Sequence, residues 1–256
     1  MTLLLISIVF ILPVVAIASY QHYKIGMQPS YDAKETLLNY EKVGSGENKL
    51  VLLQGLTGSL NYWKRELESI KKTYSLLLID LLGFGDSPKP NSEYTLSIQL
   101  TAIELILKKE GFNDGKTIIA GHSMGAIISL ALLDKQPTWF KAAIFISLPV
   151  YKNADEFKEI MSSHSFVDRI STSKFSKYIC MIHPIFMSSA FKPDNLTEEV
   201  YNDAKKHHWQ SYYYSLTEVI LKTDLYAMAK EIKDKDVLFI HGEKDTTAPL
   251  ENALKL

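Results

Sequence analysis

The chain has 256 residues, of which 46% are hydrophobic and 22% are charged, so it can bury the core of one large domain or two small ones. Aromatic residues make up 11% of the sequence and no region is dominated by proline or glycine, which argues against intrinsic disorder. The formal charge of −1 argues against a nucleic-acid binder that works through a broad basic surface.

The first 20 residues form an apolar segment without a charged side chain, and Leu3 to Ala18 is almost wholly hydrophobic. This length is close to what a bilayer crossing needs, so we expect an uncleaved, single-pass membrane anchor. A cleaved signal peptide, which would make the protein secreted, is the alternative. Ala16-Ile17-Ala18 resembles a small-x-small cleavage site, but no lysine or arginine precedes the run. A buried core helix fits poorly because the segment has no polar face.

Residues 21–34 read as a linker, after which Lys34 to Val43 is predicted to form a strand that ends at the turn Gly44-Ser45-Gly46. Short, nearly continuous apolar runs then recur along the chain. Such runs are typical of strands covered on both faces. We expect five of them, at residues 49–54, 74–81, 116–120, 142–147 and 236–241.

Helical patterns lie between the first four of these runs. The first helix is predicted around Leu60, Trp63, Leu67 and Ile70, with Ser59 as its N-cap. The second carries Leu96, Leu100, Ile103 and Leu107, with Thr95 near its start and Gly111 as its stop. The third runs from Met124 to about Lys135. Strands alternating with helices predict an α/β fold with a parallel sheet.

Residues 151–232 break this alternation and show helical spacing without a clear strand, so we interpret them as a helical cap inserted between two parts of the core, residues 35–150 and 233–256. The lone cysteine, Cys180, is expected to be a buried thiol. Aromatic and methionine side chains of the cap are expected to shape an apolar pocket or to pack as cap core: Phe157, Met161, Phe166, Phe175, Met181, Phe186, Trp209 and Tyr212 to Tyr214.

The third apolar run leads into Gly121-His122-Ser123-Met124-Gly125. A nucleophilic hydroxyl needs exposure at a sharp strand-to-helix turn, and small residues two positions before and after it relieve the crowding there. The backbone N–H of Met124 then points at an oxyanion over the start of the helix. The alternative is an ordinary glycine-rich turn.

The first apolar run leads into a second glycine-rich loop, Gln54-Gly55-Leu56-Thr57-Gly58-Ser59. Its backbone N–H groups can face an anion, and Leu56 N–H is the candidate for a second oxyanion donor. A phosphate-binding loop is disfavoured, because no Gly-Lys-Ser/Thr follows and no Gly-x-Gly-x-x-Gly is present.

Two further loops follow strand ends. The stretch from Asp80 to Pro88 reads as a tight structural turn, in which Asp86 and Ser87 can bond the turn's own backbone. The stretch from His241 to Pro249 places the carboxylate of Asp245 just past a strand end, where an acid could orient a histidine.

In this order the four loops resemble the α/β-hydrolase superfamily over about residues 35–250. The resemblance implies a mostly parallel sheet with helices on both faces and a helical cap. It implies that Ser123 is the nucleophile, Asp245 the acid, and the N–H groups of Leu56 and Met124 the oxyanion hole. The turn from Gly121 to Gly125 resembles the family's nucleophile elbow. Serine in this elbow separates the chain from dehalogenase-like and epoxide-hydrolase-like members, which carry aspartate there.

The sequence departs from the family pattern twice. Gln54 stands where the family usually has histidine, a change expected to tune the loop. The family's catalytic histidine follows the acid, whereas all seven histidines here precede Asp245. We therefore expect a C-terminally truncated copy that lacks the last helix and the edge strand.

Together these features predict a membrane-anchored serine hydrolase that acts on a small ester-like or other acyl substrate. It would need no metal or organic cofactor and no nucleic-acid partner. The alternative is a catalytically dead, truncated scaffold that works as a binding or interaction protein. The substrate itself is left open, because esterase, lipase, thioesterase and amidase chemistries share these motifs.

Overall fold

The computed structural model describes residues 12–13, 15–17, 19–20, 22–65, 67–163, 178, 192 and 196–256. Most of the expected membrane segment, and Cys180, therefore lie outside the described residues. The described part of the N-terminal segment is helical as far as Gly26. Among the helices that the structure describes, none combines the length and the apolar character that a membrane crossing requires.

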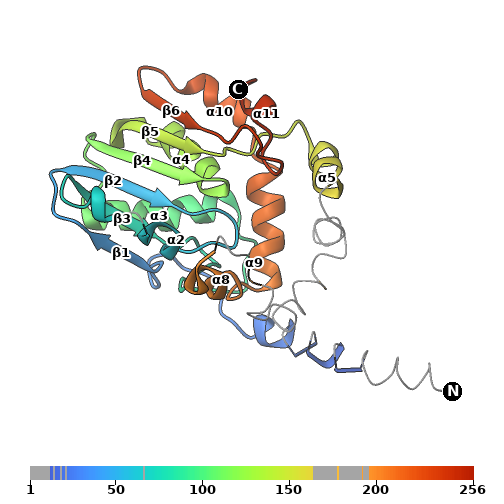
Figure 1. The fold of residues 1–256 in the computed structure, drawn as a ribbon. Coiled ribbons are helices and arrows are strands. Elements are labelled where there is room, and N and C mark those ends of the chain that lie inside the picture. Colours follow the sequence, from blue (N-terminus) through green and yellow to red (C-terminus); the bar gives the residue numbers. More distant parts are fainter. Residues whose placement is uncertain are drawn as a thin grey trace.

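The centre of the molecule is a six-stranded sheet in the order β1-β3-β2-β4-β5-β6 (Figure 1). Its strands are β1 (Tyr40–Val43), β2 (Asn48–Leu53), β3 (Tyr74–Ile79), β4 (Thr117–His122), β5 (Phe140–Ile146) and β6 (Asp236–Ile240). Only β1 runs antiparallel to its neighbour, and the other pairings are parallel. The predicted mostly parallel sheet is thus confirmed.

The prediction for the first strand was too long. β1 begins only at Tyr40, because the chain before it turns on Asp32, whose carboxylate accepts the Lys34 N–H at 2.8 Å and whose carbonyl accepts the Thr36 N–H at 3.0 Å. At the other edge of the sheet, the apolar side chains of β6 from Val237 to Ile240 are 37–53% exposed.

Helices cover both faces of the sheet, as predicted. Leu50 and Leu52 of β2 face the short helix α2 (Asn61–Lys64) and the 3-10 turn η1 (Leu67–Ser69). Val51 and Leu53 face the opposite layer, which contains α3 (Leu96–Glu110) and α4 (Met124–Lys135). Alternate side chains of β2 therefore belong to two separate apolar clusters, one on each face of the sheet.

Two predicted helices are confirmed at their ends. The Thr95 side chain caps α3 by accepting the Ile98 N–H, and Gly111 ends the helix in the left-handed conformation at a φ of 72°. Helix α4 covers Met124 to Lys135 as expected. Ten of its twelve residues are buried, which explains why its pattern shows no polar face.

The predicted helix from Leu60 to Ile70 is wrong in extent. The chain forms only the four residues of α2 and then η1. No side chain caps α2 at its N-cap residue Leu60. The Ser59 hydroxyl, expected to be the cap, lies one residue earlier, where it accepts the Asn61 N–H at 3.3 Å and donates to Asp203 at 2.6 Å. Tyr62 and Trp63 are also weak helix formers, so little sustains a longer helix here.

Between β5 and β6 the described residues form only helices and loops. The helices are α5 (Ala154–Ser162), α8 (Glu198–Ala204), α9 (Trp209–Tyr214), the π-helical turn η4 (Ser215–Ile220) and α10 (Leu225–Glu231). η4 and α10 pack against α4, and α8 contacts α2. In Figure 1 the described end of the N-terminal segment lies on the side of α8 and α9. The 3-10 turn η2 (Pro137–Trp139) precedes β5 and the short helix α11 (Leu250–Ala253) follows β6.

Candidate functional site

Ser123 lies at the sharp turn between β4 and α4. Its backbone has a φ of 52° and a ψ of −120°, a conformation that residues with a side chain rarely adopt. The Ser123 N–H donates to the carbonyl of Ile146 on β5 at 2.9 Å, which holds the turn against the neighbouring strand. A strained backbone that its surroundings hold in place is typical of a functional position.

The two glycines of the elbow are required by close backbone contacts. A Cβ on Gly121 would overlap the carbonyl of Gly125, and a Cβ on Gly125 would overlap the carbonyls of Leu53 and Gln54. The start of α4 therefore rests directly on the ends of β4 and β2. This contact explains the small residues two positions before and after Ser123 in physical terms.

The loop after β2 reaches the same point. A Cβ on Gly55 would lie 3.1 Å from Cβ of Ser123 and 3.1 Å from Nδ1 of His122. Leu56 is the next residue along the chain, so the loop that carries it lies beside Ser123. Met124, the first residue of α4, carries one of the N–H groups that have no partner within a helix.

Gln54 anchors this loop to the sheet. Its side chain is fully buried, and its amide fits its surroundings when it donates to the Ile79 carbonyl at 2.6 Å and accepts the Leu81 N–H at 2.7 Å. Gln54 therefore ties the end of β2 to the end of β3. Glutamine thus has a structural role at the position where the family usually has histidine.

Asp245 lies in the loop after β6, residues 241–249, which we call the acid loop. One of its carboxylate oxygens accepts the N–H groups of Thr247 at 3.0 Å and Ala248 at 2.9 Å, so the acid is held by its own turn. The Tyr151 hydroxyl donates to the carbonyl of Thr247 at 2.6 Å and fixes the loop to the residues after β5.

The acid loop is within electrostatic reach of the elbow. Burial lowers the pKa of His122, and the charge of Asp245 acts on it in the opposite direction. Burial also raises the pKa of Tyr151, and Asp245 adds to that shift. Asp245 and His122 are more than a hundred positions apart in the sequence. The fold brings the carboxylate of Asp245 close enough to affect the pKa of His122.

The described histidines make contacts away from Ser123. The ring of His122 stacks on Tyr62 at a centroid distance of 5.2 Å, and His22 stacks on Trp209 at 5.9 Å. His207, His208 and His241 contact backbone carbonyls through a ring nitrogen. Within the part of the chain that the structure describes, no hydrogen bond joins a histidine to the Ser123 hydroxyl. His164 and His183 lie outside the described residues.

The turn after β3 is organised by a residue that sequence reasoning did not single out. Asp80 is buried, and its carboxylate accepts the Leu60 N–H at 2.6 Å, the Asn39 amide at 2.7 Å and the Asp86 N–H at 2.8 Å. Ser87 donates to the Asp80 carbonyl at 2.7 Å, as the turn prediction expected. Burial nevertheless raises the pKa of Asp80, because the three hydrogen bonds offset its desolvation only in part.

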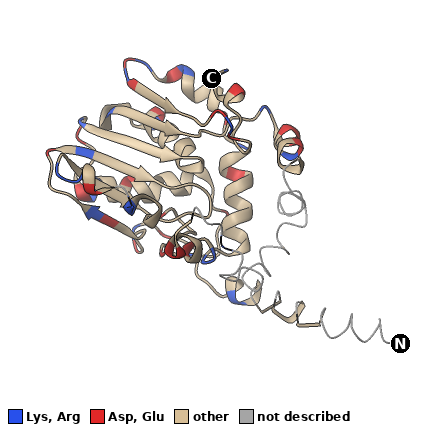
Figure 2. Cartoon of the chain, viewed as in Figure 1, with Lys and Arg blue, Asp and Glu red and all other residues tan. Residues whose placement is uncertain are grey.

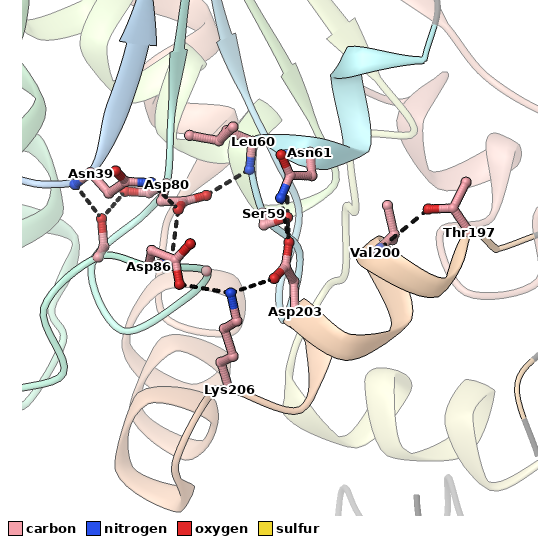
Figure 3. A network of polar contacts seen from close by, with 12 residues as sticks. Asn39, Ser59, Leu60, Asn61, Asp80, Asp86, Thr197, Val200, Asp203 and Lys206 are labelled. Atoms are coloured by element: carbon pink, nitrogen blue, oxygen red, sulfur yellow. Dashed lines mark hydrogen bonds and ion pairs between the residues drawn. The ribbon is translucent and has the colours of Figure 1, made fainter. Parts of the chain in front are cut away.

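A buried polar network connects the cap to these core loops (Figure 3). Asp203 of α8 is 4% exposed and accepts hydrogen bonds from Ser59 Oγ at 2.6 Å and Asn61 Nδ2 at 2.7 Å. Lys206 pairs with Asp203 at 2.6 Å and with Asp86 at 2.7 Å. The prediction that the Asp86 side chain bonds its own turn is therefore wrong, because its carboxylate pairs with the cap instead.

Asp203 is ionised in this network. Burial raises its pKa, but the hydrogen bonds from Lys206, Ser59 and Asn61 outweigh that effect, so the pKa lies below the ordinary value of 3.8. Ser59 and Asp203 are 144 positions apart, so no local sequence pattern predicts that the two side chains form a hydrogen bond. A signal for Asp80 was present, since it is an acidic residue at the end of a buried strand.

The described aromatic residues of the cap pack as core. Phe157 and Trp209 are buried, and Tyr212 and Tyr214 pack against buried clusters. Phe166, Phe175, Met181 and Phe186 lie outside the described residues. A cavity of about 280 Å³ lies between residues 150–152 and residues 220–226 of the cap. Tyr151, in the first of these walls, is bonded to the acid loop.

Comparisons with known proteins agree on one family. The profile described as alpha/beta hydrolase fold matches residues 48–256. A probable lysophospholipase of Arabidopsis thaliana, BODYGUARD 4, is 35% identical over 126 residues, which are 48% of this chain and 30% of that protein. Lipase 3 of a Moraxella strain is 32% identical over 114 residues, 42% of this chain and 36% of that lipase. These matches span about a third of the length of the curated relatives.

Solved structures share the fold. An esterase from Exiguobacterium antarcticum superposes with a TM-score of 0.65 at 22% identity, covering 85% of this chain and 81% of the esterase. At this identity the likeness concerns the arrangement of the chain alone.

The elbow contact generates the first prediction. We expect Gly125→Ala to lower the free energy of unfolding by about 3 kcal/mol or more, because the new methyl group must displace the backbone at the end of β2. Gly26→Ala is the matched control, because the new Cβ would meet no atom of the described residues outside its own helix within 4 Å. It should not lower the free energy of unfolding, since alanine is the better helix former. Urea denaturation measures both, and equal midpoints would contradict the account.

The cap network generates the second prediction. We expect Asp203→Asn to lower the free energy of unfolding at pH 7 by about 1–3 kcal/mol, because the lysine and two donors lose an ionised acceptor. The folded-state pKa lies below the unfolded one, so this stabilisation is present above the unfolded pKa and is lost as pH falls through the folded pKa. The gap between wild type and variant should therefore shrink below about pH 4.

The control for this measurement is Asp155→Asn, which removes an exposed ion pair with Lys158 at 3.4 Å. It should cost less than about 0.5 kcal/mol at any pH. A gap for Asp203→Asn that is constant between pH 7 and pH 3 would show that ionisation of this carboxyl does not stabilise the fold.

Proposed function

Because the chain belongs to the α/β-hydrolase fold family, we propose that it is a serine hydrolase that cleaves an ester-like or other acyl substrate. The observation that carries the proposal is the convergence at Ser123. The serine has a strained backbone with a φ of 52°, the start of α4 lies beneath it, and Gly55 of the neighbouring loop approaches its Cβ. This arrangement can present both a nucleophile and backbone donors to one carbonyl group.

In the proposed mechanism the Ser123 oxygen attacks the substrate carbonyl carbon while a base removes the hydroxyl proton. The N–H groups of Leu56 and Met124 stabilise the negative oxygen of the tetrahedral intermediate. The intermediate collapses to an acyl-enzyme, and the proton passes to the departing alcohol or amine. A water molecule then repeats the attack on the acyl-enzyme and releases the acid and free Ser123.

We propose that Asp245 orients the base, a histidine other than the five that the structure describes. Its carboxylate is held by two backbone N–H groups and acts electrostatically on the residue next to Ser123. An acid fixed in this way can hold an imidazole in the correct tautomer and stabilise its protonated form. No step of this mechanism uses a metal or an organic cofactor.

For the substrate class we propose a lipid-like ester. Support comes from relatives named as a probable lysophospholipase and a lipase, which match this chain over about a third of their own length. The cavity between residues 150–152 and 220–226 lies next to the acid loop and offers a place for one arm of such a substrate.

A second candidate is a binding scaffold without turnover. It is favoured by one observation, namely that each described histidine contacts groups other than the Ser123 hydroxyl. Such a protein would use the hydrolase fold as a frame and the cap as its recognition surface. Ser123-dependent turnover separates the two candidates.

The third prediction concerns activity of the protein as its own gene produces it. We expect hydrolysis of p-nitrophenyl esters, with Ser123→Ala lowering kcat at least about 1,000-fold and Asp245→Asn about 10²- to 10⁴-fold. Ser97→Ala, on the exposed side of α3, is the control and should leave kcat within about twofold. Turnover that survives Ser123→Ala would remove the serine from the mechanism, and no turnover at all would favour the scaffold.

The fourth prediction concerns residues 1–20, which we propose as a membrane anchor on the strength of their uninterrupted apolar character. Peptide mapping of the native protein from the membrane fraction should recover an N-terminal peptide that begins at Met1. A mature N-terminus at Ser19 or Tyr20 would instead establish a cleaved signal peptide.

A further inference from the structure

The glycine-rich loop after β2, residues 54–59, folds into a tight turn. The Gly58 N–H donates to the Gly55 carbonyl at 3.1 Å, so Leu56 and Thr57 occupy the two central positions of this turn. Thr57 has a φ of 63°, in the left-handed region that a β-branched residue rarely adopts. Among the described residues no acceptor binds the Leu56 N–H. The turn therefore leaves this N–H available in a backbone conformation that its surroundings must maintain.

The two ends of the turn are attached to different parts of the fold. At the entry, Gln54 is bonded to the end of β3, and Gly55 packs against Cβ of Ser123. At the exit, the Ser59 side chain is buried, and its hydroxyl donates to the Asp203 carboxylate at 2.6 Å (Figure 3). The entry is thus fixed by the core sheet, whereas the side chain at the exit is held by the cap.

The position of Asp203 on α8 is unfavourable for the helix itself. Figure 2 shows α8 as an acidic segment, and Glu198 and Glu199 lie in its first turn, where negative charge complements the helix dipole. Both are exposed, whereas Asp203 is buried in the last turn, where negative charge opposes the dipole. The stability of α8 therefore does not account for this carboxylate, which instead accepts hydrogen bonds from Ser59 and Asn61.

The two carboxylate oxygens of Asp203 have separate partners. Oδ2 accepts Ser59 Oγ at 2.6 Å and Asn61 Nδ2 at 2.7 Å, while Oδ1 pairs with Lys206 at 2.6 Å. Lys206 is paired in turn with Asp86, in the turn after β3, at 2.7 Å. The carboxylate cannot rotate without breaking one of these charge-assisted contacts, so it holds the Ser59 hydroxyl in one place.

We propose that Asp203 is a positioning residue, which acts through Ser59 to hold the Leu56 N–H in place for the oxyanion. This inference rests on the proposed function, in which that N–H stabilises the tetrahedral intermediate. A backbone donor is effective only while its geometry is preorganised, and a displacement of about 1 Å can cost about 100-fold in rate. Release of the exit would let the strained Thr57 relax and would turn the Leu56 N–H away from the reacting carbonyl.

The first test measures whether Asp203 holds the loop, and it needs no turnover. Hydrogen-exchange mass spectrometry compares the full-length wild type with Asp203→Ala and with Ser59→Ala. We expect the amides of residues 54–60 to exchange at least about fivefold faster in both variants, because the loss of one hydrogen bond shifts a local opening equilibrium by about that factor. Peptides from β4 and β5 should keep their rates within about twofold. Ser59→Ala removes a single hydroxyl and serves if Asp203→Ala does not fold.

The second test separates catalysis from folding. It compares kcat/KM for an ester with kcat/KM for the matching thionoester, whose larger sulfur is a weak acceptor for the N–H groups of an oxyanion hole. We expect the ester-to-thionoester ratio to fall at least about fivefold in Asp203→Ala and in Ser59→Ala, because a displaced Leu56 N–H no longer favours oxygen. A loss of folded protein lowers both rates equally and leaves this ratio unchanged. The double variant should match Asp203→Ala within about twofold, since Ser59 transmits the effect.

Tyr94→Phe is the matched control for both tests. It removes a buried hydroxyl that donates to the Pro90 carbonyl at 2.7 Å and contacts His208 of the cap at 3.2 Å, and neither partner belongs to the glycine-rich loop. It should leave the exchange of residues 54–60 and the ester-to-thionoester ratio within about twofold. Unchanged exchange in the Asp203 and Ser59 variants, or faster exchange with an unchanged ratio, would overturn the inference and leave the proposed function standing. A wild type without Ser123-dependent turnover would overturn both.

Discussion

The carboxylate of Asp80 is buried at the end of β3 and accepts hydrogen bonds from three separate segments. Asn39 precedes β1, Leu60 is the N-cap residue of α2, and Asp86 lies in the turn that follows β3. An ionised group in this position is costly to bury, and the three donors together offset that cost in part, so the loss of any one of them makes the burial costlier. The same turn carries Asp86, which pairs with Lys206 of the cap, so the position of the cap depends on how Asp80 shapes the core. The cap in turn reaches the expected oxyanion loop, because Asp203 binds Ser59 and Asn61.

A second constraint acts through the backbone alone. Gly121, Gly125 and Gly55 bring the ends of β4 and β2 and the start of α4 together around Ser123. The strained φ of 52° at the serine persists because these contacts, and the bond from its N–H to Ile146, allow no relaxed alternative. The site is therefore specified by the absence of side chains as much as by their chemistry.

Most of the fold was predictable because its signals are local. Buried parallel strands read as short apolar runs, and α3 carries its own start and stop at Thr95 and Gly111. The elbow glycines were likewise visible as a pattern. The short extent of α2 was not, because its N-cap is Leu60 and the expected cap, Ser59, donates to a partner 144 positions away. The cap network shares this property, because it joins residues from distant segments and no window of sequence contains the interaction.

Covalent labelling shows whether the fold activates Ser123 as a nucleophile. The full-length protein, isolated from its own cells and shown to be folded, is incubated with a fluorophosphonate, and intact mass and peptide mapping follow. Our account predicts one phosphonyl adduct, located on Ser123 and absent after Ser123→Ala. A folded protein that acquires no adduct, or acquires it on another residue, would contradict the account.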